Sequence, residues 1–139
     1  MNAVDTNILV YQMDSSEAVK SPKAAALLLA LAASSVETVL RWQVAGEFLN
    51  QLRRWEATHR LSRAQWMKEF TAVRKSYRLV IPPDVVFDRS LDLTSRFSLS
   101  HWDSMIVAAC IESGVTKLYT EDMGSPTNFD ALELENPFA

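Results

Sequence analysis

Four acidic residues of the chain occupy positions where an α/β protein would gather catalytic groups. Asp5 and Asp122 each follow a short β-like run, and Glu47 and Asp103 each fall in the opening turns of an expected helix. In an open α/β sheet the ligand site lies beyond the carboxyl ends of the strands. A helix that follows a strand begins at that same edge, so we expect the four carboxylates to converge there.

Each carboxylate, taken singly, also has an ordinary structural explanation. Asp5 would cap the helix that follows it, and Asp103 would complete a capping box. Glu47 would complement a helix dipole, and Asp122 would form an Asx turn. For any one of these residues alone the structural explanation is the better one, so the functional hypothesis depends on convergence.

Convergence of four carboxylates would require a cation among them. Two like charges about 4 Å apart repel by about 4 kcal/mol at an effective dielectric constant near 20. Oxygen ligands without histidine or cysteine favour Mg²⁺ or Mn²⁺ over zinc. Such a metal site suits hydrolysis of phosphodiester bonds. If the carboxylates converge, metal binding should raise the melting temperature, and Asp5→Asn should stabilise the metal-free protein by relieving repulsion. A destabilising Asp5→Asn with no response to metal would instead favour the capping explanation.

The charges are unevenly distributed along the chain, although the net charge is only −3. The segment from Arg41 to Arg78 holds nine basic residues against three acidic ones, and the rest of the chain is acidic. A basic segment of this kind would track the phosphates of a nucleic acid beside an acidic metal site. Solvent-exposed faces of two helices explain the same pattern without any ligand.

Length and composition indicate one soluble globular domain, residues 1–139, with 48% hydrophobic and 22% charged residues. The only cysteine, Cys110, excludes an internal disulfide and indicates a reducing compartment. No signal peptide is visible, and the most apolar segment, Ala24 to Ala33, is about half a bilayer span. We therefore expect a cytoplasmic protein without a membrane segment.

The expected elements alternate between short strands and helices. Strands are expected at Met1–Val4, Val36–Trp42, Tyr77–Ile81, Lys117–Thr120 and Leu132–Leu134. Helices are expected from Ser21-Pro22 to Ala33, over Val44–Thr58, Arg63–Ser76 and Trp102–Ser113, and in the segment that ends near Arg96. This alternation predicts an α/β fold with a mainly parallel central sheet of four to five short strands and helices on both faces.

Several residues mark the boundaries of these helices. Ser62 and Gln65 form one expected capping box, and Ser100 and Asp103 form a second. Gly114 is expected at the C-terminal end of the last helix.

Five segments of the chain resemble the PIN-domain ribonucleases, in particular the VapC-type toxins of bacterial toxin–antitoxin (VapBC) pairs. They occur in family order: Val4–Leu9, Gln43–Phe48, Leu99–Ala109, Leu118–Met123 and Asn136–Phe138. Any one of them is weakly specific, but together and at these spacings they cover the whole chain. The region from Gly124 to Asp130 departs from the family pattern because it is shorter and less typical.

The resemblance implies a Mg²⁺/Mn²⁺-dependent endoribonuclease, the toxin of a type II system, with Asp5, Glu47, Asp103 and Asp122 as catalytic and metal-binding residues. It also implies that Asn7 and Thr120 are polar residues around the metal. Glu121, next to Asp122, is a weaker candidate, because in a chain that is still extended it would point the other way, to the surface. The expected partners are an RNA substrate, a second copy in a homodimer, and a cognate antitoxin protein. An acidic pocket would suit a basic side chain supplied by that antitoxin.

Two other functions compete with this one. Phosphoryl transfer through an aspartyl-phosphate also begins with an aspartate after the first strand, but Asp5-Thr6-Asn7 lacks the second acid of the phosphatases. A PIN-fold module that binds RNA or a partner without cleaving it is the other alternative. His101, one residue after the expected helix cap, would either contact substrate or be solvated. Cys110, Trp55 and Trp66 are expected to pack in the core.

Overall fold

The computed structural model describes residues 1–139, which form six strands and six helices. In chain order these are β1 (Asn2–Val4), α1 (Thr6–Met13), α2 (Lys20–Ala33), β2 (Thr38–Arg41), α3 (Trp42–Ala57), α4 (Arg63–Ser76), β3 (Arg78–Val80), α5 (Val86–Arg96), α6 (His101–Glu112), β4 (Lys117–Tyr119), β5 (Asn128–Phe129) and β6 (Leu132–Glu135).

All six strands belong to one sheet, in the order β3-β2-β1-β4-β6-β5. Every neighbouring pair is parallel except β5 and β6, which form an antiparallel hairpin. The mainly parallel α/β fold predicted from the sequence is thus confirmed. The sheet has one strand more than the predicted four to five because β5, with two residues, is too short to show a β pattern.

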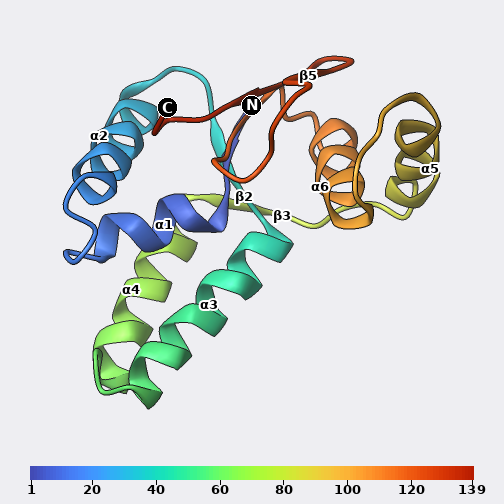
Figure 1. Ribbon diagram of the computed structural model, residues 1–139. Helices are drawn as coiled ribbons and strands as arrows, with labels where there is room; N and C mark the ends of the chain where they lie inside the picture. The colour runs from blue at the N-terminus through green and yellow to red at the C-terminus, as the bar shows by residue number, and fades with distance from the viewer.

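Helices cover both faces of the sheet, as Figure 1 shows: α1 to α4 on one side, α5 and α6 on the other. Side chains of a strand alternate between the two faces. Val4 and Leu40 accordingly pack in a core beneath α1 to α4, whereas Ala3 and Val39 pack in a second core beneath α5 and α6. The central strands β1 and β2 are thus covered on both faces, as expected of parallel strands, whereas β6 exposes Glu133 and Glu135 on one face.

The predicted cap at Ser62 is present, with both reciprocal hydrogen bonds of a capping box to Gln65. At α6, Ser100 accepts a hydrogen bond from the backbone N–H of Asp103, but the reciprocal bond of the predicted second box is not formed. Gly114 ends α6 with a φ of 80°, which glycine adopts at little cost.

The start of α2 differs from its prediction. The sequence predicts a helix that starts at Ser21-Pro22, but the helix begins at Lys20, with Val19 at the cap position and no capping side chain. Pro22 still lies in the first turn, where its missing N–H costs no helical hydrogen bond.

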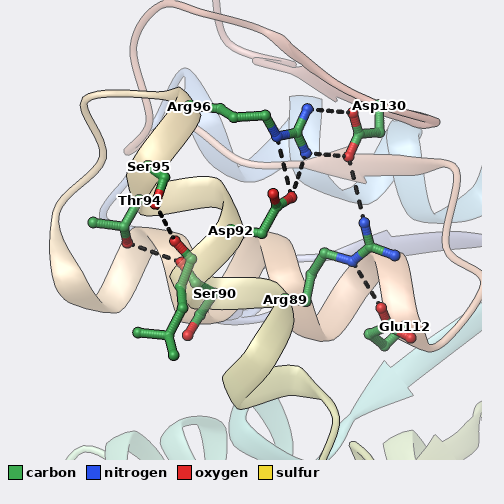
Figure 2. A network of polar contacts seen from close by, with 9 residues as sticks. Arg89, Ser90, Asp92, Thr94, Ser95, Arg96, Glu112 and Asp130 are labelled. Atoms are coloured by element: carbon green, nitrogen blue, oxygen red, sulfur yellow. Dashed lines mark hydrogen bonds and ion pairs between the residues drawn. The ribbon is translucent and has the colours of Figure 1, made fainter.

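A network of ion pairs fastens the hairpin of β5 and β6 to the last two long helices (Figure 2). Arg96 of α5 binds Asp92 on its own helix and Asp130 in the hairpin turn. Arg89 binds Glu112 of α6 at 2.7 Å and lies 3.7 Å from Asp130. The guanidinium of Arg96 lowers the pKa of Asp130, so the network is retained at neutral pH.

The three residues predicted to pack in the core are buried. Trp55 and Trp66 are 6% and 8% exposed, and Cys110 is fully buried. No helix of the structure has both the length and the apolar character needed to cross a membrane.

Candidate active site

The carboxyl edge of the sheet carries a small acidic pocket. Asp5 follows β1 and Thr120 follows β4, the strand that pairs with β1. The pocket has a volume of about 170 Å³, and its lining residues are Asp5, Thr6, Asn7, Glu47, Asp103, Ile106, Asp122 and Met123. The structure thus brings all four carboxylates singled out in the sequence around one pocket, from four different segments.

Asp5 is held by three donors within the chain. As the N-cap of α1, its Oδ1 accepts a 3.3 Å hydrogen bond from the backbone N–H of Thr6. Its Oδ2 accepts a 2.8 Å hydrogen bond from the hydroxyl of Thr120. The guanidinium of Arg41, the last residue of β2, lies 3.3 Å from Oδ1. Asp5 thus both caps α1 and lines the acidic pocket, two roles that the sequence had presented as alternatives.

The ion pair with Arg41 reverses the expected effect of Asp5→Asn on the stability of the metal-free protein. The Arg41 side chain is only 5% exposed and that of Asp5 14%, and the Nε of Arg41 is buried without a hydrogen-bond partner. Asp5→Asn would leave this buried guanidinium without its counter-charge, which costs more than relief of carboxylate repulsion returns. The substitution should therefore destabilise the metal-free protein.

Glu47 and Asp103 differ in how tightly the chain holds them. Glu47 accepts a 2.6 Å hydrogen bond from the hydroxyl of Thr6 and a 2.9 Å hydrogen bond from the amide of Gln43. The carboxylate of Asp103 has no hydrogen bond or ion pair within the chain; its backbone N–H alone is bound, to Ser100. Asp103 is therefore the carboxylate that is free to bind a ligand without first breaking an internal contact.

Asp122 is the carboxylate of the pocket whose ionisation the surroundings oppose. Burial, followed by the negative charges of Asp5 and Glu121, raises its pKa above the ordinary value, while a 2.9 Å hydrogen bond from Asn7 opposes the rise. Thr120 accepts a hydrogen bond from the backbone N–H of Asp122 as well as donating to Asp5. Asn7 and Thr120 thus contact the carboxylates directly.

Glu121 does not point to the surface, as was expected from an extended chain. β4 ends at Tyr119, and the backbone then turns, so that the Glu121 side chain is 14% exposed. It accepts hydrogen bonds from Tyr11 and Asn7 and forms a 3.0 Å ion pair with Lys20. Burial opposes its ionisation, but these contacts outweigh burial and lower its pKa.

Two solved structures have a fold similar to that of this chain. A toxin–antitoxin complex from Klebsiella pneumoniae matches with a TM-score of 0.63 and 16% identity over 99% of this chain and 98% of that chain. Mycobacterium tuberculosis VapC20, a sarcin-ricin loop cleaving toxin, matches with a TM-score of 0.62 and 16% identity over 88% and 90%. The chain has the PIN-like fold of VapC structures.

At this level of identity the match shows the PIN-like fold and leaves function to be argued from the site. No protein-family model matches the chain, and no curated protein sequence matches it.

The donor set of the pocket fits a hard divalent cation, because its charged ligands are carboxylates. The side chains are not gathered into a ready ligand cluster, however: no three of the acidic, histidine or cysteine side chains lie close enough together to hold a metal ion. The internal donors explain this, since Asp5, Glu47 and Asp122 are each turned toward a hydrogen-bond partner. A metal would have to compete with Thr6, Asn7 and Arg41 for these carboxylates.

Sequence reasoning missed the two basic residues of this region. Arg41 was counted with the basic segment, and only the register of β1 and β2 brings it to Asp5. Lys20 was not considered because it lies outside the predicted α2, yet it binds Glu121.

Only some of the basic residues between Arg41 and Arg78 are free of ion pairs within the chain. Arg60, Arg63 and Arg78 form ion pairs with acidic residues, and Arg41 is buried against Asp5. The remaining five form no ion pair within the chain: Arg53, Arg54, Lys68, Arg74 and Lys75, all on α3 and α4. These two helices form the antiparallel pair that projects from the sheet in Figure 1.

Proposed function

We propose that the chain is a Mg²⁺- or Mn²⁺-dependent endoribonuclease, the toxin of a type II toxin–antitoxin pair. The observation that carries the proposal is the pocket in which Asp5, Glu47, Asp103 and Asp122 meet on a PIN-like fold. Support comes also from the similar fold of VapC20, which is described as a toxin that cleaves the sarcin-ricin loop.

In this proposal the four carboxylates hold the metal, and Asn7 and Thr120 orient two of them. Thr120 fixes Asp5, and Asn7 fixes Asp122. When bound, the metal supplies activation of water and neutralisation of charge on the phosphodiester. Asp103, which has no internal partner, is the first carboxylate available to it. The unpaired cations of α3 and α4 would bind the phosphates of the RNA on either side of the pocket.

The proposal extends to partners and location. A homodimer and a cognate antitoxin belong to it, supported by the large apolar side chains that lie exposed on and before α5, among them Ile81, Phe87 and Leu91. The antitoxin would place a basic group in the acidic pocket. We propose a cytoplasmic location, where both RNA and antitoxin are available.

One observation favours a second candidate, a PIN-fold module that binds RNA or a partner without cleaving it. The carboxylates do not form a ready metal cluster. This module would bind RNA through α3 and α4, and would not respond to divalent cations.

Cleavage of a total RNA preparation by purified protein separates the two candidates. The wild type should cleave in Mn²⁺ and not in EDTA, and Asp103→Asn should abolish cleavage while the protein remains folded. Asp88→Asn is the matched control, because Asp88 carries the same charge, is exposed on α5 and lies outside the pocket. Cleavage by Asp103→Asn at the wild-type rate would refute the nuclease. RNA binding with no cleavage under any metal condition would favour the binding module.

A further inference from the structure

A second, larger hollow opens beside the acidic pocket, between α3, α4 and the end of β3. Its volume is about 580 Å³, within the range of small-ligand pockets. Trp42 and Phe70 contribute aromatic surface, Arg74 contributes a cation, and Gly46 lies between them in the lining. Glu47 lines both this hollow and the acidic pocket, so the two lie next to each other.

The chemistry of the hollow suits a nucleobase with its phosphate. The Trp42 side chain is 59% exposed, so its ring offers an open π-face. The side-chain amide of Asn50 makes no hydrogen bond within the chain, and the side chain of Gln43 uses only its Nε2, toward Glu47, leaving its amide oxygen free. Arg74 forms no ion pair and is available for a phosphate. An aromatic platform with free amides and an unpaired cation is the combination that binds single-stranded nucleic acid.

Gly46 keeps this hollow open. A Cβ added at Gly46 would meet no atom within 4 Å, so packing within the chain does not require a glycine there. Glycine inside a helix costs about 1 kcal/mol relative to alanine. The residue thus gives up helix stability at a position of α3 that lines the hollow and where an added side chain would meet open space.

We propose that this hollow binds an unpaired base of the RNA strand, next to the phosphodiester held at the acidic pocket. The base stacks on Trp42, the amides of Gln43 and Asn50 contact its edge, and Arg74 binds a neighbouring phosphate. The inference deepens the proposed nuclease function, on which it rests, by naming where the enzyme distinguishes unpaired from paired RNA.

A second copy of the chain is the competing occupant of an apolar hollow. A two-fold contact through this face would place the same surface patch of each copy in the interface. The unpaired cations of α3 and α4, Arg74 among them, would then lie on both sides of the interface, and like charges across an interface oppose association. RNA phosphates neutralise the same cations, and the charge pattern therefore favours RNA.

The test measures binding of a fluorescently labelled single-stranded RNA of mixed sequence to the Asp103→Asn protein in Mn²⁺, by anisotropy. Adding Trp42→Ala, or separately Gly46→Leu, should weaken binding about tenfold, the size expected of one stacked base. Gly46→Leu tests the hollow without removing the platform, and it should not impair folding because the added side chain enters open space. Neither change should weaken binding of an RNA duplex.

A charge-matched pair completes the test. Arg74→Gln should weaken binding more than Lys75→Gln, because Arg74 lines the hollow and Lys75 does not. Equal losses from both, or unchanged affinity with Trp42→Ala and Gly46→Leu, would overturn the proposal. So would sedimentation showing that Trp42→Ala converts a dimer to a monomer, since a second copy would then cover the hollow. Binding that depends on Trp42 in a protein whose wild type never cleaves would support the hollow and refute the nuclease.

Discussion

Replacing Asp5 by asparagine should destabilise the metal-free protein, although it removes one charge from a crowded acidic pocket. The buried guanidinium of Arg41 has Asp5 as its only ion-pair partner. Removing one partner of a buried pair costs about 3–5 kcal/mol, and the single 3.3 Å contact puts this pair at the lower end. Asparagine has one amide oxygen in place of two carboxylate oxygens, so it keeps either the hydrogen bond from Thr6 or the one from Thr120, but not both.

Relief of repulsion offsets part of this loss. Asp5 contributes to the raised pKa of Asp122, so the two charges interact. Like charges about 8 Å apart repel by about 2 kcal/mol at an effective dielectric constant of 20, and solvent at the pocket mouth reduces that further. The net loss is then about 2 kcal/mol, which lowers the melting temperature of a domain of this size by roughly 8 °C.

Thermal unfolding followed by circular dichroism in EDTA measures this change. Asp103→Asn is the control: it removes the same charge from the same pocket, but its carboxylate has no internal partner, so its melting temperature should equal or exceed that of the wild type. Combining Asp5→Asn with Arg41→Met should recover most of the lost stability, because the double variant no longer buries an unpaired guanidinium. A melting temperature of Asp5→Asn above that of the wild type would refute a stabilising ion pair between Asp5 and Arg41.

Three further predictions concern two neighbouring acidic residues and the single thiol. The pKa of Glu121 is lowered through its contacts with Tyr11 and Lys20, so its contribution to stability is complete above its ordinary value of 4.5 and is lost as pH falls through its folded pKa; Glu121→Gln should lower the melting temperature at pH 7 and have less effect at pH 3. The pKa of Asp122 is raised, so its charge opposes folding as pH rises past 3.8; Asp122→Asn should raise the melting temperature of the metal-free protein at pH 7, and a fall would contradict the sign. Burial raises the pKa of Cys110, so a disulfide reagent at pH 8 should label it only on unfolding; rapid labelling of the native protein would contradict this burial.

The positions of the acidic residues could be predicted because local patterns determine them. Strand ends, helix caps and the order of elements placed Asp5, Glu47, Asp103 and Asp122 at one edge without knowledge of any long-range contact. The same local signals gave the cap at Ser62. What these residues contact could not be predicted, because each contact depends on how separate segments pair in space.

Arg41 and Glu121 show this limit. The charge of Arg41 suggested a solvated residue, and only the pairing of β2 with β1 buries it beside Asp5. The alternation of an extended strand predicted that Glu121 points outward, but the strand ends at Tyr119. β5 escaped prediction for a related reason, since two residues form a strand only when a partner such as β6 is present.

The central position of β1 also affects when the pocket can form during synthesis. β1 pairs with β2 on one side and with β4 on the other, and the hydrogen bond from Thr120 to Asp5 joins residues 115 positions apart. A growing chain emerges from its N-terminal end, and contacts of such long sequence separation form late. A nascent chain interrupted before β4 would present Asp5, Glu47 and Asp103 without Asp122. The four-carboxylate pocket therefore stays incomplete while most of the chain is still being translated.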